Sequence, residues 1–187
     1  MVQTSQQAHI SGAASRRKPR NNRLLVVVDE SSSSKYAVEY LARVLASRRG
    51  FRVCLAHFLP PLPSELLEFG GAEDPDKERK LDTQLKTGQQ QWIAVARKEA
   101  QPALNWACTK LRRAGLPASS LTTKFSDPFR EHNSASEEIL ELARNNKCRT
   151  IVVGRRSLPW LRRLTSGKDL AEKLMQQGKG FTLWIVE

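Results

Sequence analysis

The residues best placed to do chemistry lie in one basic loop near the carboxyl end of the chain. Gly154 stands directly at the end of an apolar run, and Gly167 comes directly before a helical pattern. Glycine lets a ligand approach the backbone closely, and the free amides at a helix amino terminus bind anions. Lys168 and four arginines surround these two points: Arg155, Arg156, Arg162 and Arg163. The pattern fits a phosphate-binding loop and equally a solvated basic loop with a helix-capping glycine.

A second polar segment follows the first apolar run. Asp29 comes directly after Val28, and Glu30 and the serines 31–34 lead into a helical pattern. Side chains of these types cap helices by accepting hydrogen bonds from the first amides. Ligands of open parallel sheets bind at the carboxyl ends of the strands, near the point where the strand order reverses. The loops after Val28 and Val153 are therefore the candidate site.

The elements that must position these loops alternate along the chain. Largely apolar runs, typical of strands buried on both faces, predict strands at 24–28, 51–58, 150–153 and 181–186, and a further short strand is predicted at 121–125. Helical spacing of apolar residues predicts helices around 37–45, 85–114, 134–143 and 169–175. The alternation predicts an α/β fold: a Rossmann-like, open, twisted, parallel five-stranded sheet with helices on both faces.

Two irregularities interrupt this alternation. Residues 60–84 are long for a strand-to-helix connection, and we interpret them either as a mobile cover over a site or as a surface insertion. Pro102 lies inside the longest helical pattern, where proline removes a backbone hydrogen bond, so we expect a kink or a split there.

Composition favours one domain with a basic tail. Residues 1–22 are polar and basic without apolar periodicity, which predicts a disordered tail ahead of a single domain at 23–187. The net charge of +12 favours attraction to polyanions, and the cluster 16–20 is either a tether to phosphate or a solvated tail. Neither a membrane-spanning run nor an apolar signal core is present, so we expect a cytoplasmic protein without membrane contact.

Signatures of dedicated catalysis are missing from the sequence. Cys54, Cys108 and Cys148 are far apart and form no metal-ligand spacing with a histidine. His57 ends a strand and is interpreted as a packed residue. Neither a Walker A motif nor a nucleophile elbow is present. We therefore expect no catalytic residues, no metal site and no enzymatic activity beyond slow incidental ATP hydrolysis.

Three motifs, in order and with matching spacing, resemble the universal stress proteins. The segment 29–38 is similar to that family's opening of Asp, Gly-Ser, Ser and Ala-Leu, and Ala56-His57-Phe58 is similar to the end of its second strand. The loop at Gly154 is similar to its nucleotide signature, Gly-x2-Gly-x9-Gly-Ser/Thr. The resemblance covers about residues 23–187 and implies the fold called adenine nucleotide alpha hydrolase-like.

The resemblance also implies a nucleotide site. Val28 and Asp29 would meet adenine and ribose, and Phe58 would flank the base. The phosphates would be held by four residues of the signature loop: Gly154, Ser157, Gly167 and Lys168. Ser157 replaces a glycine and Lys168 replaces a small hydroxyl residue of the family pattern. Lys168 could bind phosphate through its charge instead. The family includes both members that bind ATP and members that lack the full motif and do not.

Two functions are therefore open. One is a non-catalytic binding or signalling module that senses or holds ATP at the carboxyl edge of the sheet. The alternative is a nucleotide-independent dimeric adaptor with a vestigial ATP motif, which docks acidic protein partners through its basic face. Nucleic acid is expected only as weak nonspecific binding. The last strand, Phe181–Val186, lies at an expected sheet edge, and the family resemblance implies a homodimer through it.

Overall fold

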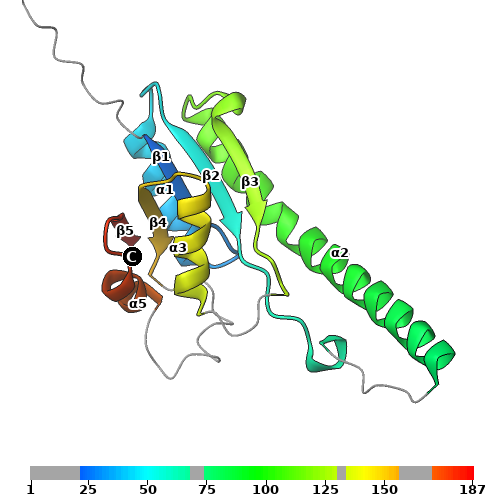
Figure 1. Cartoon of the computed structure of the whole chain (residues 1–187). Helices are drawn as coiled ribbons and strands as arrows, with labels where there is room; N and C mark the ends of the chain where they lie inside the picture. Colours follow the sequence, from blue (N-terminus) through cyan, green and yellow to red (C-terminus); the bar gives the residue numbers. More distant parts are fainter. Residues whose placement is uncertain (1–21, 68–73, 130–133, 156–169) are drawn as a thin grey trace, which may run out of the picture.

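The structure is a computed structural model that describes residues 22–67, 74–129, 134–155 and 170–187. Residues 1–21 of the expected tail at 1–22 and the site residues Ser157, Gly167 and Lys168 lie outside these ranges. Five strands form one parallel sheet, in the order β3-β2-β1-β4-β5 (Figure 1). The strands are β1 (Arg23–Val27), β2 (Arg52–His57), β3 (Leu121–Phe125), β4 (Thr150–Gly154) and β5 (Thr182–Val186). The predicted fold class is confirmed.

Helices cover both faces of the sheet, as predicted. On one face, α1 (Ser32–Leu45) and α2 (Pro75–Arg113) pack against each other. On the other face lie α3 (Ala135–Asn145) and α5 (Leu170–Gln177). Successive strand residues point to opposite faces, so β1 contributes Val26 to the core under α1 and α2 and Leu25 to the core under α3. This double burial explains why the inner strands β1 and β4 are almost entirely apolar, whereas the edge strand β3 has an exposed, polar middle.

Helix α2 begins ten residues earlier than the sequence analysis predicted, so residues 75–84 are helical and not part of the connection. Asp74 caps the helix by accepting a hydrogen bond from the Asp76 amide at 3.0 Å, and Pro75 occupies the first turn. Proline is favoured there because its missing N–H has no intrahelical partner in any case. Of the two outcomes expected at Pro102, the split is wrong, because the helix is continuous through this residue.

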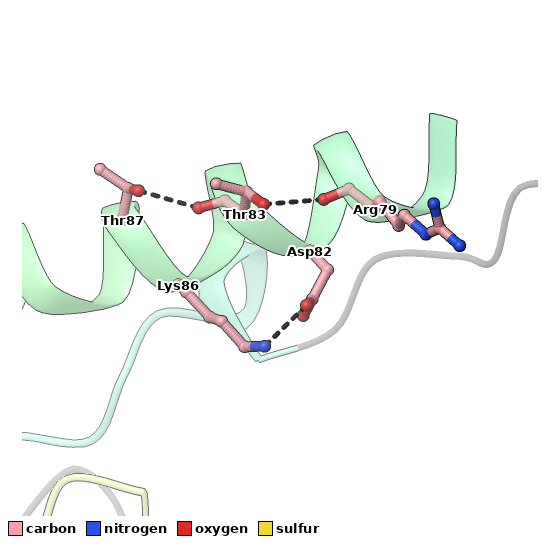
Figure 2. Close-up of polar contacts among 5 residues, drawn as sticks. All are labelled: Arg79, Asp82, Thr83, Lys86 and Thr87. Atoms are coloured by element: carbon pink, nitrogen blue, oxygen red, sulfur yellow. Dashed lines mark hydrogen bonds and ion pairs between the residues drawn. The ribbon is translucent and has the colours of Figure 1, made fainter. Parts of the chain in front are cut away.

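The amino-terminal part of α2 extends beyond the carboxyl edge of the sheet (Figure 1). The buried residues of α2 all lie in its last part, from Ala100 to Leu111. The projecting part is supported by local contacts: Lys86 pairs with Asp82 at 2.7 Å, and Thr83 donates to the Arg79 carbonyl at 2.8 Å (Figure 2). It also contacts the short 3-10 turn η1 (Ser64–Leu66), where Gln89 donates to the Leu66 carbonyl at 2.7 Å.

The described helices include none that is long and apolar enough to cross a membrane.

Candidate functional site

The strand order reverses between β1 and β4, as the sequence analysis required for a ligand site. These two strands are paired, with Val26 opposite Val152. The helix that follows β1, α1, covers one face of the sheet, and the helix that follows β4, α5, covers the other. The ends of β1 and β4 therefore meet at the carboxyl edge. Asp29 and Gly154, two predicted site residues, both lie there.

The carboxylate of Asp29 organises the start of α1. Asp29 is 4% exposed, and its Oδ1 accepts hydrogen bonds from the Ser31 amide at 2.9 Å and from the Ser31 hydroxyl at 2.5 Å. Ser31 is the N-cap of α1, because its Oγ accepts from the Ser34 amide at 3.1 Å. Asp29 thus supports the cap residue and is not the cap itself.

Ser34 is a structural residue of the site that the sequence analysis missed. Its side chain is fully buried, and its Oγ accepts a hydrogen bond from the Asp29 amide at 2.9 Å and donates to the Val27 carbonyl at 3.4 Å. This hydroxyl fixes the turn between β1 and α1. The signal was available, because Ser34 occupies the buried face of the helix together with Val38 and Leu41.

The position of Gly154 requires a glycine, because α1 approaches its backbone closely. A Cβ at this position would lie 2.4 Å from the backbone carbonyl of Ser33 and from its Oγ. Atoms cannot approach this closely, so any larger residue must displace the first turn of α1. The glycine is therefore explained by helix packing, and replacing it disturbs the fold as well as any ligand.

The two apolar residues of the predicted nucleotide site are core residues. Val28 is 1% exposed, and its amide donates to the Ala56 carbonyl at 2.8 Å. Phe58 is 0% exposed and packs in the core that includes Ala135 and Ile139 of α3. In this structure the Phe58 ring therefore has no free face on which a base could stack, contrary to the role that the family resemblance implies.

His57 is packed, as interpreted, and lies at the same edge. It is 7% exposed, its ring centroid is 6.3 Å from that of Phe125, and its Nδ1 has no hydrogen-bond partner within the described part of the chain. Burial lowers its pKa, against the opposing effects of Glu30, the Val28 backbone and Asp29. At neutral pH the His57 imidazole is therefore uncharged, and it lies near the turn that contains Asp29.

Arg155 is the one basic residue of the signature loop that the described ranges include. Its side chain pairs with Glu187, and its amide donates to the Val186 carbonyl at 2.7 Å. These contacts join the end of β4 to the end of β5.

Comparisons with known proteins agree with this architecture. The family model described as the universal stress protein family matches residues 20–179. The chain resembles the crystal structure of a universal stress protein family member from Burkholderia pseudomallei, with 16% identity and a TM-score of 0.58 over 91% of this chain and 98% of that one. It also resembles the crystal structure of a universal stress protein in complex with cAMP, with 18% identity and a TM-score of 0.52 over 89% of this chain and 97% of that one.

At these identities the likeness to solved structures shows the fold. A search of curated proteins gave no match. The match of the family model over most of the length, together with the parallel sheet and its strand order, shows that the chain belongs to the universal stress protein family.

Proposed function

We propose that this protein is a binding or signalling module that holds an adenine nucleotide, ATP, at the carboxyl edge of its sheet and does not turn it over. The nucleotide occupies the point where the ends of β1 and β4 meet. Family membership and the cAMP complex of a structural neighbour support an adenine nucleotide as the ligand class.

The observation that carries the proposal is the hydrogen bond that the Ser31 hydroxyl donates to the Asp29 carboxylate. The Ser31 hydroxyl donates to Asp29 Oδ1 at 2.5 Å, which shows that this carboxylate is placed to accept a hydrogen bond from an alcohol. A ribose offers the same donor group, and hydrogen bonds to a charged acceptor are the stronger ones. This contact supports Asp29 as the group that would bind the ribose, whose hydroxyl would take the place of the Ser31 hydroxyl.

Titration calorimetry with ATP tests this proposal on the full chain. Asp29→Asn keeps a carbonyl oxygen for Ser31 but removes the charge, so we expect ATP affinity to fall at least tenfold. The matched control is Ser31→Ala, which removes the competing hydroxyl and leaves the carboxylate. We expect it to lower stability by about 1 kcal/mol, as loss of an N-cap does, with ATP affinity kept or raised.

The result that contradicts the proposal is equally direct. Protein that releases no nucleotide on denaturation, as judged by mass spectrometry, and shows no heat with millimolar ATP is not a nucleotide-binding member. The non-catalytic part of the proposal is tested on protein mixed with ATP. The bound ATP should remain unhydrolysed over hours. Rapid phosphate release would refute the non-catalytic part.

A further inference from the structure

Basic side chains gather at the amino edge of the sheet, opposite the candidate site. The segments that enter the strands are joined there by backbone hydrogen bonds, from Arg52 to Asn22 at 3.0 Å and from Thr182 to Arg149 at 2.8 Å. The turn after α1 meets the end of α2 through the Ser47 amide, which donates to the Ala114 carbonyl at 3.4 Å. We call this surface the amino-edge surface. Its basic residues are Arg23, Arg48, Arg49, Arg52, Arg112, Arg113, Arg144, Lys147, Arg149 and Lys179.

Most residues of the amino-edge surface come from segments of the chain that contain no acidic residue. Residues 40–64, 100–126, 142–168 and 173–186 contain neither aspartate nor glutamate. Three acids lie instead at the carboxyl edge, where Asp29, Asp127 and Glu187 follow β1, β3 and β5. The described part of the chain therefore has one edge at which basic residues outnumber acids.

Helix dipoles explain only some of these charges. Helices α1, α2 and α3 end at this edge, and their last turns contain basic residues such as Arg113 and Arg144. Cations near a helix carboxyl terminus are favourable. However, Arg48, Arg49 and Lys179 lie outside the helices, so their accumulation needs another explanation.

The charges are exposed and crowded. Arg23 and Arg52 are opposite each other on neighbouring strands, whose backbones are about 4.8 Å apart, so two positive residues begin the pair. Seven side chains of the surface are exposed and form no ion pair within the described residues: Arg48, Arg49, Arg52, Arg112, Arg113, Arg149 and Lys179. A polyanion would neutralise these charges.

We propose that the amino-edge surface binds the phosphate backbone of a nucleic acid without reading its sequence. Arginine dominates the surface, and its planar guanidinium binds phosphate through two parallel hydrogen bonds. Five strands span about 19 Å, enough to meet several phosphates of a duplex that carries one charge per ~1.7 Å. Base stacking is not part of the contact, because the exposed aromatic residues of the described ranges, Tyr36, Tyr40 and Phe129, lie elsewhere.

This surface and the nucleotide site lie at opposite edges of one sheet. The proposal is therefore independent of nucleotide binding, and its failure would leave the nucleotide proposal untouched.

Fluorescence anisotropy with a labelled 20-base-pair DNA duplex of mixed sequence tests the proposal between 50 and 200 mM salt. The amino-edge variant carries Arg48→Gln, Arg49→Gln and Arg112→Gln. The control carries Lys77→Gln, Lys80→Gln and Lys98→Gln, which remove the same charge from exposed positions of α2. Both variants keep residues 1–21, so any contribution of that segment is the same in each.

We expect the amino-edge variant to lose at least tenfold in affinity. The slope of the logarithm of the binding constant against that of salt should shrink by about 2 to 3, roughly 0.9 for each lost phosphate contact. The control should stay within threefold of the parent, and a second duplex of unrelated sequence should bind the parent equally well.

Three results would overturn the proposal. The first is an equal loss in both variants, which means attraction by net charge alone. The second is a parent protein that does not bind the duplex at 50 mM salt. The third is binding of polyglutamate in place of DNA, which assigns the surface to an acidic protein. Circular dichroism of the variants confirms that all three chains are folded, and exposed glutamines at these positions leave the core unchanged.

Discussion

His57 makes the stability of the protein sensitive to mild acid. Its folded-state pKa is lowered from the usual 6.5 because burial disfavours the charged imidazole. The unfolded chain therefore takes up a proton more readily than the folded chain. The contribution of His57 to stability is complete above pH 6.5 and is lost as the pH falls from there through the lowered folded pKa.

Urea unfolding between pH 7.5 and 5.5 measures this effect. The free energy of unfolding should fall with pH in the parent, and the fall should be smaller in His57→Gln, whose side chain does not titrate. The same pH dependence in both proteins would show that His57 does not titrate differently in the folded and unfolded states.

At the residue scale, the sequence indicated where the polar groups would lie but not what each would touch. Asp29 and Gly154 were placed at the reversal of strand order because that rule depends only on the order of elements. The contacts from Asp29 to Ser31 and from Gly154 to Ser33 depend on the approach of α1, which spacing does not reveal. For the same reason, the burial of Phe58 could not be read from its position at a strand end.

At the scale of elements, α2 divides into two parts of unequal stability. Residues 100–111 face the core, and Arg97 lies over the Phe125 ring of β3, whereas residues 75–96 depend on local contacts and on η1. An isolated helix of this length is marginal in water, so the projecting part opens more easily.

Hydrogen exchange followed by mass spectrometry checks this division. Amides of residues 79–96 should exchange much faster than those of residues 104–113, where the helix is packed against α1 and the sheet. Equal protection along α2 would mean that another surface covers the projecting part.

The start of α2 could have been predicted from the sequence. Asp74 followed by Pro75 and by acids in the first turn is the expected pattern of a helix start, but the residues that follow lack a strong apolar stripe. Periodicity detects helices that bury a face. It therefore found α2 from about residue 85 onward and missed its first ten residues, 75–84.

At the scale of the whole molecule, β5 is an edge strand. It pairs with β4 on one side and has no strand partner on the other within the described residues. Its apolar residues, among them Trp184 and Ile185, are only half buried. An open edge of this kind invites pairing with another chain, and we propose a homodimer through β5.

Light scattering tests the dimer. The parent should have twice the mass of one chain, and Ile185→Lys should have the mass of one, with Val95→Lys on α2 as a control of equal charge at an exposed apolar site. Ile185 also packs against the core, so the fold of the variant is verified by circular dichroism. A monomeric parent would exclude the dimer without recourse to any variant.

The contact between Gly154 and Ser33 has a mechanical consequence. At Gly154 the end of β4 lies so close to Ser33 in the first turn of α1 that even a Cβ would not fit, so β4 cannot move toward α1 unless α1 moves with it. A displacement of the end of β4 toward α1 is therefore passed to α1, and through α1 to α2, which packs beside it and extends beyond the sheet. The candidate site and the projecting part of α2 are therefore mechanically coupled through α1.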